Sequence, residues 1–157
     1  MKFYIDSTVF LHLLLDEEWA DRAMSILEAV ERGDATGYVS ILVVEEVAFK
    51  LLFAKASELG VTRFWEFKKR LLKDKGFREE CFKPLLKFNE YLNRLSGLAW
   101  IHVTWEDYRM GLEIAYKYGL LTADAIHAAL ALKLRVPIAT FDEDFKKVPG
   151  LTVVGRA

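Results

Sequence analysis

Short apolar runs alternate with helix-length segments along this chain, and this alternation limits the possible folds more than any other feature of the sequence. The runs that we expect to form strands are 2–5, 36–39, 99–103, 137–141 and 151–154. Helices are expected at 7–15, 17–32, 41–56, twice within 61–96, from 105 to near 119, and at 123–134. Strands that alternate with helices are typical of an α/β fold around a parallel sheet. Neither an internal repeat nor a Pro/Gly-rich linker interrupts the pattern, so we expect one domain over residues 1–157.

Local capping signals mark where three of these helices begin. Ser40 stands at the N-cap position before the helix that starts at residue 41. The segment Thr104–Asp107 resembles a capping box, and Gly119 is suited to the end of the helix that follows it. Thr122 is expected to cap the last long helix.

The composition predicts a soluble, cytoplasmic protein. Of the 157 residues, 53% are hydrophobic and 13% are aromatic, which is enough for a sizeable core. The single cysteine, Cys81, excludes an intrachain disulfide and a multi-cysteine zinc site, and it favours a reducing compartment. The apolar stretch 41–53 contains Glu45, Glu46 and Lys50, so we expect no membrane-spanning segment. Because the net charge is −1, a nucleic-acid binder of this kind would need locally concentrated positive charge.

Acidic residues recur at the positions that a parallel sheet brings to one edge. Asp6 directly follows the first strand, and Asp142 follows the fourth. Glu45 and Glu46 lie in the second turn of the helix after the second strand. Asp124 lies in the first turn of a helix whose other end leads into the fourth strand. Parallel strands joined by right-handed crossovers carry their sites beyond the carboxyl ends of the strands, so these acids are expected to converge there.

A group of unpaired carboxylates repels itself, and raised pKa values are expected without a cation. Mg²⁺ or Mn²⁺ relieves that repulsion, because hard cations take carboxylate oxygens together with water and substrate phosphates. Such an ion activates water for phosphodiester hydrolysis. Each acid also has an ordinary alternative: Asp6 as a turn residue, Asp124 as a first-turn helix acid, and Asp142 with Asp144 as part of a solvated acidic turn.

Several polar neighbours are secondary candidates. Three hydroxyls can hydrogen-bond a carboxylate or a phosphate, or else cap turns: Ser7, Thr8 and Thr140. His127 lies one turn beyond Asp124, where it either supports the site or simply packs in the helix. Asp144 either holds a metal through water or caps the short turn after it.

Positive charge is concentrated in residues 61–78, where seven Lys/Arg residues face two acids with aromatic residues between them. Such a mixture suits RNA phosphates and bases, and Lys69, Arg70 and Lys73 are the candidate RNA contacts. The alternative is an amphipathic helix with a solvated face. The two helices expected in this region separate near Gly76, with Pro84 close to the start of the second.

Four segments together resemble PIN-domain proteins, most closely the VapC-like toxins of toxin–antitoxin pairs and their archaeal-type relatives. The segments are Tyr4–Phe10, Val39–Val47, Leu121–Ala129 and Ile138–Phe145. The resemblance implies a three-layer α/β fold with a five-stranded parallel sheet flanked by helices. It also implies Mg²⁺- or Mn²⁺-dependent RNA cleavage, frequent homodimers and often a small antitoxin partner.

Carried over residue by residue, the acidic quartet of these proteins falls on Asp6, Glu46, Asp124 and Asp142, as metal ligands and catalytic residues. Glu46 is preferred because it lies six residues after Ser40 and precedes an aliphatic residue, and Glu45 is the alternative. The chain departs from compact toxins in the longer helical segment at about 57–96, and in Phe141, which replaces the usual polar residue before the fourth acid.

Three other functions compete with metal-dependent RNA cleavage. A non-catalytic PIN-like module would bind RNA or a protein without cutting, and the retention of all four acids argues against it. A receiver-type phosphoacceptor domain needs paired acids after the first strand, where Ser7 follows Asp6. A phosphatase of the haloacid type needs a second aspartate at the position of Thr8.

Overall fold

A five-stranded parallel sheet organises the chain in the computed structural model, which describes residues 1–156. Its strands are β1 (Lys2–Ile5), β2 (Thr36–Ser40), β3 (Leu98–Ile101), β4 (Ile138–Thr140) and β5 (Val153–Gly155). The strand order is β3-β2-β1-β4-β5, and every neighbouring pair is parallel. The predicted α/β architecture around a parallel sheet is therefore confirmed.

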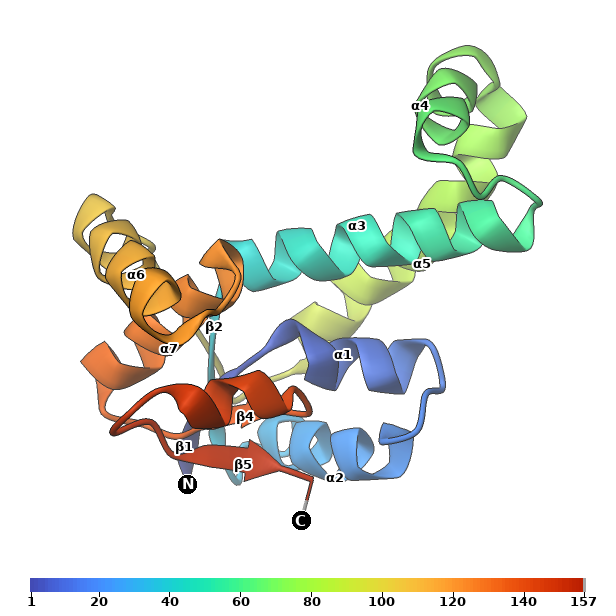
Figure 1. Ribbon diagram of the computed structural model, residues 1–157. Helices are drawn as coiled ribbons and strands as arrows, with labels where there is room; N and C mark the ends of the chain where they lie inside the picture. Colours follow the sequence, from blue (N-terminus) through green and yellow to red (C-terminus); the bar gives the residue numbers. More distant parts are fainter. Residues whose placement is uncertain (157) are drawn as a thin grey trace.

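Helices connect the strands and cover the sheet. They are α1 (Ser7–Leu14), α2 (Ala20–Glu31), α3 (Ile41–Glu58), α4 (Phe64–Lys73), α5 (Lys75–Arg94), α6 (Trp105–Tyr118), α7 (Thr122–Leu134) and the 3₁₀-helix η1 (Glu143–Lys147). In Figure 1, α6 and α7 lie together on one side of the sheet, whereas α1 and α2 lie on the other. The long helix α3 packs against both α1 and α5.

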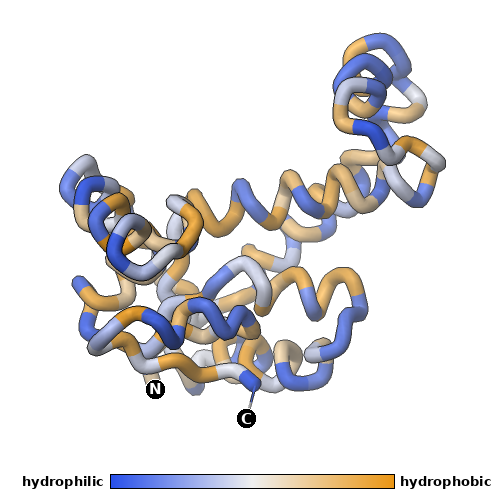
Figure 2. The backbone as a smooth tube through the Cα atoms, in the orientation of Figure 1, coloured by the Kyte–Doolittle hydropathy of each residue, from blue (hydrophilic) through white to orange (hydrophobic). Residues whose placement is uncertain are grey.

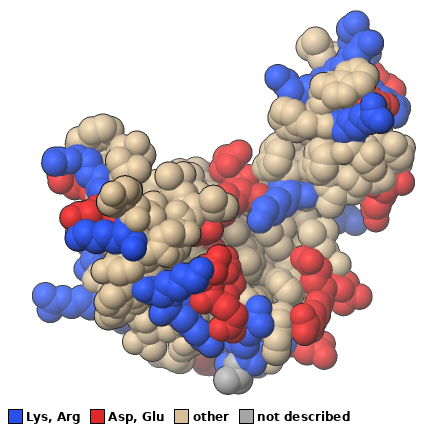
Figure 3. Space-filling model, viewed as in Figure 1, with Lys and Arg blue, Asp and Glu red and all other residues tan. Residues whose placement is uncertain are grey.

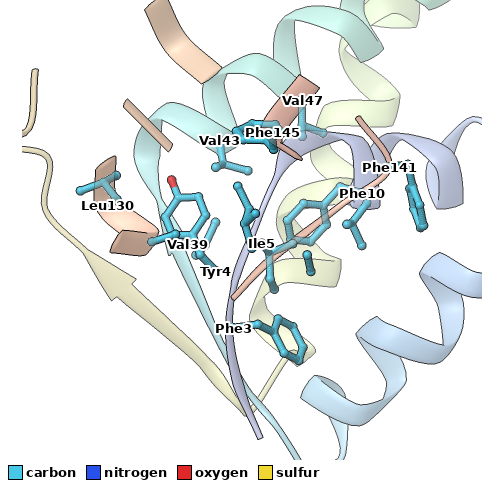
Figure 4. Close-up of a cluster of buried hydrophobic side chains, with 14 of the residues drawn as sticks. Phe3, Tyr4, Ile5, Phe10, Val39, Val43, Val47, Leu130, Phe141 and Phe145 are labelled. Atoms are coloured by element: carbon cyan, nitrogen blue, oxygen red, sulfur yellow. The ribbon is translucent and has the colours of Figure 1, made fainter. Parts of the chain in front are cut away.

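The centre of the sheet is the most deeply buried part of the chain. Strand β1 pairs with β2 on one side and β4 on the other, so Tyr4 and Ile5 are completely buried. Figure 4 shows both side chains packed among Phe10, Val39 and Leu130, which come from three other elements. A central parallel strand buries both faces, which explains why its sequence is a continuous apolar run.

Several helix boundaries differ from the sequence prediction by one to three residues, the largest difference being the start of α2 at Ala20, where residue 17 was expected. Helices α4 and α5 separate at Asp74, two residues before the expected break near Gly76, because the Asp74 side chain accepts a hydrogen bond from the Phe77 backbone N–H and caps α5. Gly76 is consequently inside the first turn of α5. The expectation that Pro84 lies close to the start of this helix was wrong, since Pro84 is near the middle of the 20-residue helix.

Of the capping predictions, those for α6 held in full, the one for α3 held in position only, and the one for α7 was wrong. Thr104 and Asp107 form a reciprocal capping box at the start of α6, and Gly119 ends that helix with a left-handed φ of 77°. Ser40 precedes α3 as predicted, but in the described chain its side chain makes no capping hydrogen bond. Thr122 is the first helical residue of α7 and not its cap, a position that Leu121 occupies.

Residues 49–83, called the helical arm from here on, extend away from the sheet (Figure 1). The arm consists of the second half of α3, all of α4 and the first half of α5. It has a small core of its own, formed by Ala56, Val61, Phe67, Phe77 and Cys81. In Figure 2, hydrophilic and hydrophobic residues alternate along α4, whereas α1 and α3 are mainly hydrophobic, with hydrophilic positions between the hydrophobic stretches of α3. Among residues 1–156, no helix combines the length and the apolar character needed to cross a membrane.

Candidate metal centre

Four chain segments bring the predicted acids toward one edge of the sheet. Asp6 directly follows β1, and Asp142 lies between β4 and η1. Glu46 is in the second turn of α3, and Asp124 is in the first turn of α7. These acids lie in one electrostatic neighbourhood: burial, followed by the negative charges of Asp6, Glu46 and Asp142, raises the pKa of Asp124 to about 6.

Asp6 is the most deeply buried of these acids, with 1% of its surface exposed. Its Oδ2 atom accepts hydrogen bonds from the Thr8 hydroxyl at 2.8 Å and from the Thr140 hydroxyl at 2.7 Å. Its Oδ1 atom is also buried and has no hydrogen-bond partner within residues 1–156. A buried carboxylate oxygen without a partner is costly. This oxygen is therefore suited to a cation.

The two threonine hydroxyls tie the loop after β4 to Asp6. Thr8 Oγ1 accepts a hydrogen bond from the Phe141 backbone N–H at 3.0 Å, and Thr140 Oγ1 accepts one from the Asp142 backbone N–H, also at 3.0 Å. Each hydroxyl thus receives a backbone hydrogen and donates its own to the same carboxylate oxygen. The arrangement fixes Asp6 and the start of the Asp142 loop relative to each other.

Glu46 is held by a buried chain of hydrogen bonds. Its Oε1 atom is 2.7 Å from Nε2 of His127, and Nδ1 of that ring is 2.7 Å from the Tyr4 hydroxyl. The Tyr4 hydroxyl in turn lies 2.9 Å from Ser40 Oγ. Burial, the largest single influence, would raise the pKa of Glu46, but the hydrogen bond from His127 and the charge of that ring, together with a hydrogen bond from Ser7 and the charge of Lys50, lower it.

His127 is itself fully buried, and both of its ring nitrogens have partners. Burial would lower its pKa, yet the hydrogen bond to Glu46 and the charges of Asp6, Glu46 and Asp124 raise it. One ligand atom from each of Asp6, Glu46 and His127 lies within 4.8 Å of the others, a grouping that could hold a metal ion. Because His127 already donates to Glu46, its geometry favours orienting that carboxylate over binding the ion directly.

The donor set fits a hard divalent cation such as Mg²⁺ or Mn²⁺. Carboxylate oxygens are the preferred ligands of these ions, and the buried, unpartnered Oδ1 of Asp6 provides one. Burial and the neighbouring negative charges both raise the pKa of Asp124, and a cation would relieve the repulsion between those charges. Cys81, a softer ligand, is buried in the core of the helical arm.

The remaining predicted site residues have different surroundings. Glu45 is exposed, whereas the side chain of Glu46 is 17% exposed. Asp144 is exposed, forms an ion pair with Lys147 at 2.9 Å, and donates its backbone N–H to Asp142 Oδ1.

The predicted RNA contacts lie on α4, at the outer end of the helical arm (Figure 1). Lys69 and Lys73 are exposed there. Arg70 is engaged within the arm, with its guanidinium 3.0 Å from Asp74 Oδ2 and 4.3 Å from the centre of the Phe77 ring.

Sequence reasoning missed Tyr4 and Ser40, which complete the hydrogen-bond chain behind Glu46. Tyr4 was read as a strand residue and Ser40 as a helix cap. A hydroxyl within an otherwise apolar buried strand was the available signal, since a buried Tyr hydroxyl needs a partner.

Comparison with known proteins supplies a family context. The sequence model of the PIN domain family matches residues 3–151. Ribonuclease VapC6 of Methanocaldococcus jannaschii is 31% identical over 152 residues, which cover 96% of this chain and 95% of that protein. Ribonuclease VapC2 of the same organism is 25% identical over 154 residues, covering 98% and 93%.

Solved structures share the fold. VapBC2 from Rickettsia felis bound to a DNA fragment from the promoter matches with a TM-score of 0.62 and 16% identity, covering 99% of this chain and 98% of that one. A toxin–antitoxin complex from Klebsiella pneumoniae matches with a TM-score of 0.57 and 18% identity, covering 97% and 95%. At these identities the similarity concerns the fold alone.

Proposed function

The chain belongs to the PIN-domain family, and on that premise we propose that it is a Mg²⁺- or Mn²⁺-dependent endoribonuclease of the VapC type that hydrolyses RNA phosphodiester bonds. The observation that carries the proposal is the buried, unpartnered Oδ1 of Asp6 within a group of acids. The nearly full-length similarity to a protein named ribonuclease VapC6 supports RNA as the substrate.

Asp6, Glu46, Asp124 and Asp142 are the residues proposed to hold the cation. A divalent cation held by carboxylates activates water and offsets charge on the attacked phosphate. The surrounding residues keep the acids in place. Thr8 and Thr140 fix the second oxygen of Asp6, and His127 fixes one oxygen of Glu46. Asp142 is positioned through its backbone N–H, which donates to Thr140.

The proposal is tested with purified protein and a fluorescent single-stranded RNA. Cleavage is expected with Mg²⁺ or Mn²⁺ and is expected to stop with EDTA. Asp6→Asn and Asp124→Asn each remove a ligand charge with little change in shape, so both should lower the rate by orders of magnitude. Circular dichroism confirms that the variants remain folded. If both variants cut RNA at the parent's rate, these residues are not the metal site.

The two adjacent glutamates provide a matched pair for the same assay. Glu46→Gln should cripple cleavage, because Glu46 is the half-buried acid bound to His127. Glu45→Gln should have a mild effect, because Glu45 is exposed. The reverse result would mean that Glu45 is the functional acid and that the assignment is off by one residue.

A small antitoxin protein is the proposed partner. Two of the similar structures are complexes by their names, one a toxin–antitoxin complex from Klebsiella pneumoniae and the other VapBC2 from Rickettsia felis. The test is to express this chain alone and together with the product of the neighbouring reading frame. Growth arrest that is relieved by co-expression, together with a complex on size-exclusion chromatography, supports a toxin. The same column measures whether the free chain is a homodimer, as the family resemblance implies.

A further inference from the structure

Helix α3 connects the acidic site to the helical arm through one of its faces. Three residues follow Glu46 at the spacing of one helix face, namely Phe49, Lys50 and Phe53, which are three, four and seven residues after it. With a rise of about 1.5 Å per residue, Phe53 lies about 10 Å from Glu46 along the axis. Lys50 is one helical turn beyond Glu46 on this face, so its ammonium group belongs to the part of α3 that adjoins the acidic site.

This face of α3 leads into a group of aromatic rings shared with α4. The Phe49 and Phe53 rings stack with their centres 6.3 Å apart, and Phe64 lies 6.3 Å from Phe49. Phe67 is the buried member of this group: its ring centre lies 5.2 Å from that of Phe53, and the residue is 2% exposed. Phe49 and Phe64 are 43% and 54% exposed, and Trp65, the residue after Phe64 in α4, is 62% exposed. Exposed apolar side chains that lie together, as those of Phe49 and Phe64 do, mark interaction sites.

The charge of the arm indicates what kind of partner this surface fits. Residues 49–83 hold ten Lys/Arg and five Asp/Glu, a local charge of +5 in a chain whose net charge is −1. Figure 3 shows Lys and Arg gathered over the outer end of the arm. Within residues 1–156, six of these basic side chains form no ion pair: Lys50, Arg63, Lys68, Lys69, Lys73 and Arg78. Lys68 Nζ lies 5.9 Å from the centre of the Phe64 ring.

We infer that the surface formed by Phe49, Lys50, Phe64, Trp65 and Lys68, called the arm strip, binds the single-stranded stretch of RNA next to the scissile bond. Exposed rings stack with bases, and ammonium groups beside them contact phosphates. A duplex offers few free base faces, so the strip favours single strands. The inference rests on the proposed function and extends it to the placement of the substrate. In this inference Lys50 and Lys68 are the basic contacts instead of Arg70, because the Arg70 guanidinium forms an ion pair with Asp74.

The test measures RNA binding without cleavage, by fluorescence anisotropy in EDTA, with single-stranded and duplex RNA of the same length. Phe64→Ala combined with Trp65→Ala should weaken single-strand binding by about tenfold per lost stack. The matched control is Trp105→Ala on α6, where the aromatic residue is 68% exposed but lies outside the arm. The control should bind like the parent.

Charge variants provide a second measurement that does not depend on the rings. Lys50→Ala combined with Lys68→Ala should make the salt dependence of single-strand binding shallower by a slope of about 1.4. Lys87→Ala, an exposed lysine of α5 outside the strip, is the control. Thermal melting checks that the arm core, which keeps Phe67, remains folded in every variant.

Parent affinity and an unchanged salt slope in both arm-strip variants would overturn the inference. The same holds if the variants keep RNA binding but lose the antitoxin, because the strip would then be a protein-binding surface. If the parent protein binds RNA through the arm strip but never cleaves it, the proposed function is refuted, while the inference that the strip binds RNA remains valid. The two failures are therefore distinguishable.

Discussion

At the scale of single residues, the buried chain from Ser40 through Tyr4 and His127 to Glu46 explains how one carboxylate is oriented. A carboxylate can only accept, so Nε2 of His127 carries the hydrogen of that bond. The carboxylate oriented in this way would be a ligand of the proposed cation. The polar atoms that form these hydrogen bonds lie deep in the protein, where a polar atom without a hydrogen-bond partner is costly.

Removing His127 should therefore weaken metal binding. Residues that orient a metal ligand typically affect affinity by about 10–100-fold, and we expect a loss of this size in His127→Leu. His127→Gln can still offer an N–H near the position of Nε2 and should recover part of the affinity. The measurement is the Mn²⁺ dissociation constant by calorimetry, alongside the Mg²⁺ dependence of cleavage. Parent-like affinity in His127→Leu would show that Glu46 does not need this support.

The acid–base balance of the site predicts how the metal-free protein responds to pH. The pKa of Asp124 is raised to about 6 in the folded protein, so the folded state binds this proton more tightly than the unfolded state does. The resulting destabilisation is present above pH 6 and is relieved as the pH falls through 6 toward 4. The raised pKa of His127 acts in the same direction, because its stabilisation is lost as the pH rises through the folded pKa.

Asp124→Asn should consequently stabilise the metal-free protein at pH 7 while abolishing cleavage. The free energy of unfolding should rise by about 1 kcal/mol. This is well below what the full pKa shift implies, because the Asp124 carboxyl is partly exposed and screened by solvent. Urea unfolding in EDTA at pH 7 and pH 5 measures it. The difference between variant and parent should shrink at pH 5, and an equal difference at both values would contradict the electrostatic explanation.

At the scale of elements, local signals were predictable and tertiary hydrogen bonds were not. The capping box of α6 needs only Thr104 and Asp107, three residues apart, and the sequence contains both. The Ser40 hydroxyl, by contrast, hydrogen-bonds Tyr4, which is 36 residues away. The edge at which the acids gather followed from strand direction alone, whereas the hydrogen-bond partners behind Glu46 depend on packing that no local pattern encodes.

The contrast between two threonines tests this view of the caps. Thr104→Ala should destabilise the protein by about 1 kcal/mol, because it removes the hydroxyl that accepts the Asp107 backbone N–H. Thr122→Ala should have almost no effect, because Thr122 is exposed and stands inside α7 and not at its cap. The melting temperature of each variant measures the difference. Equal losses in the two variants would mean that the capping hydroxyl of Thr104 contributes no more than the hydroxyl of Thr122.

At the scale of the whole molecule, opposite charges are segregated. Negative charge gathers where the acids lie at the sheet edge, and positive charge gathers in the helical arm. The two charges nearly cancel, so the net charge of −1 reveals neither of them. The composition alone argued mildly against a polyanionic partner. The helical arm removes that objection, because the basic residues concentrated in this segment of the sequence gather at its outer end.

Metal binding should stabilise the whole fold, since the acidic group joins distant parts of the chain. Asp6 follows β1, Glu46 belongs to α3 and Asp124 to α7, so an ion held by all three would tie the centre of the sheet to the helices on either side. A ligand that binds only the folded state adds about 2.7 kcal/mol at a hundredfold excess over its Kd. We therefore expect Mn²⁺ to raise the melting temperature in a concentration-dependent way that EDTA reverses, while NaCl at equal ionic strength does not. Asp6→Asn should abolish this rise, because it removes the charge of the carboxylate whose buried Oδ1 has no partner in residues 1–156. An undiminished rise in Asp6→Asn would place the ion elsewhere.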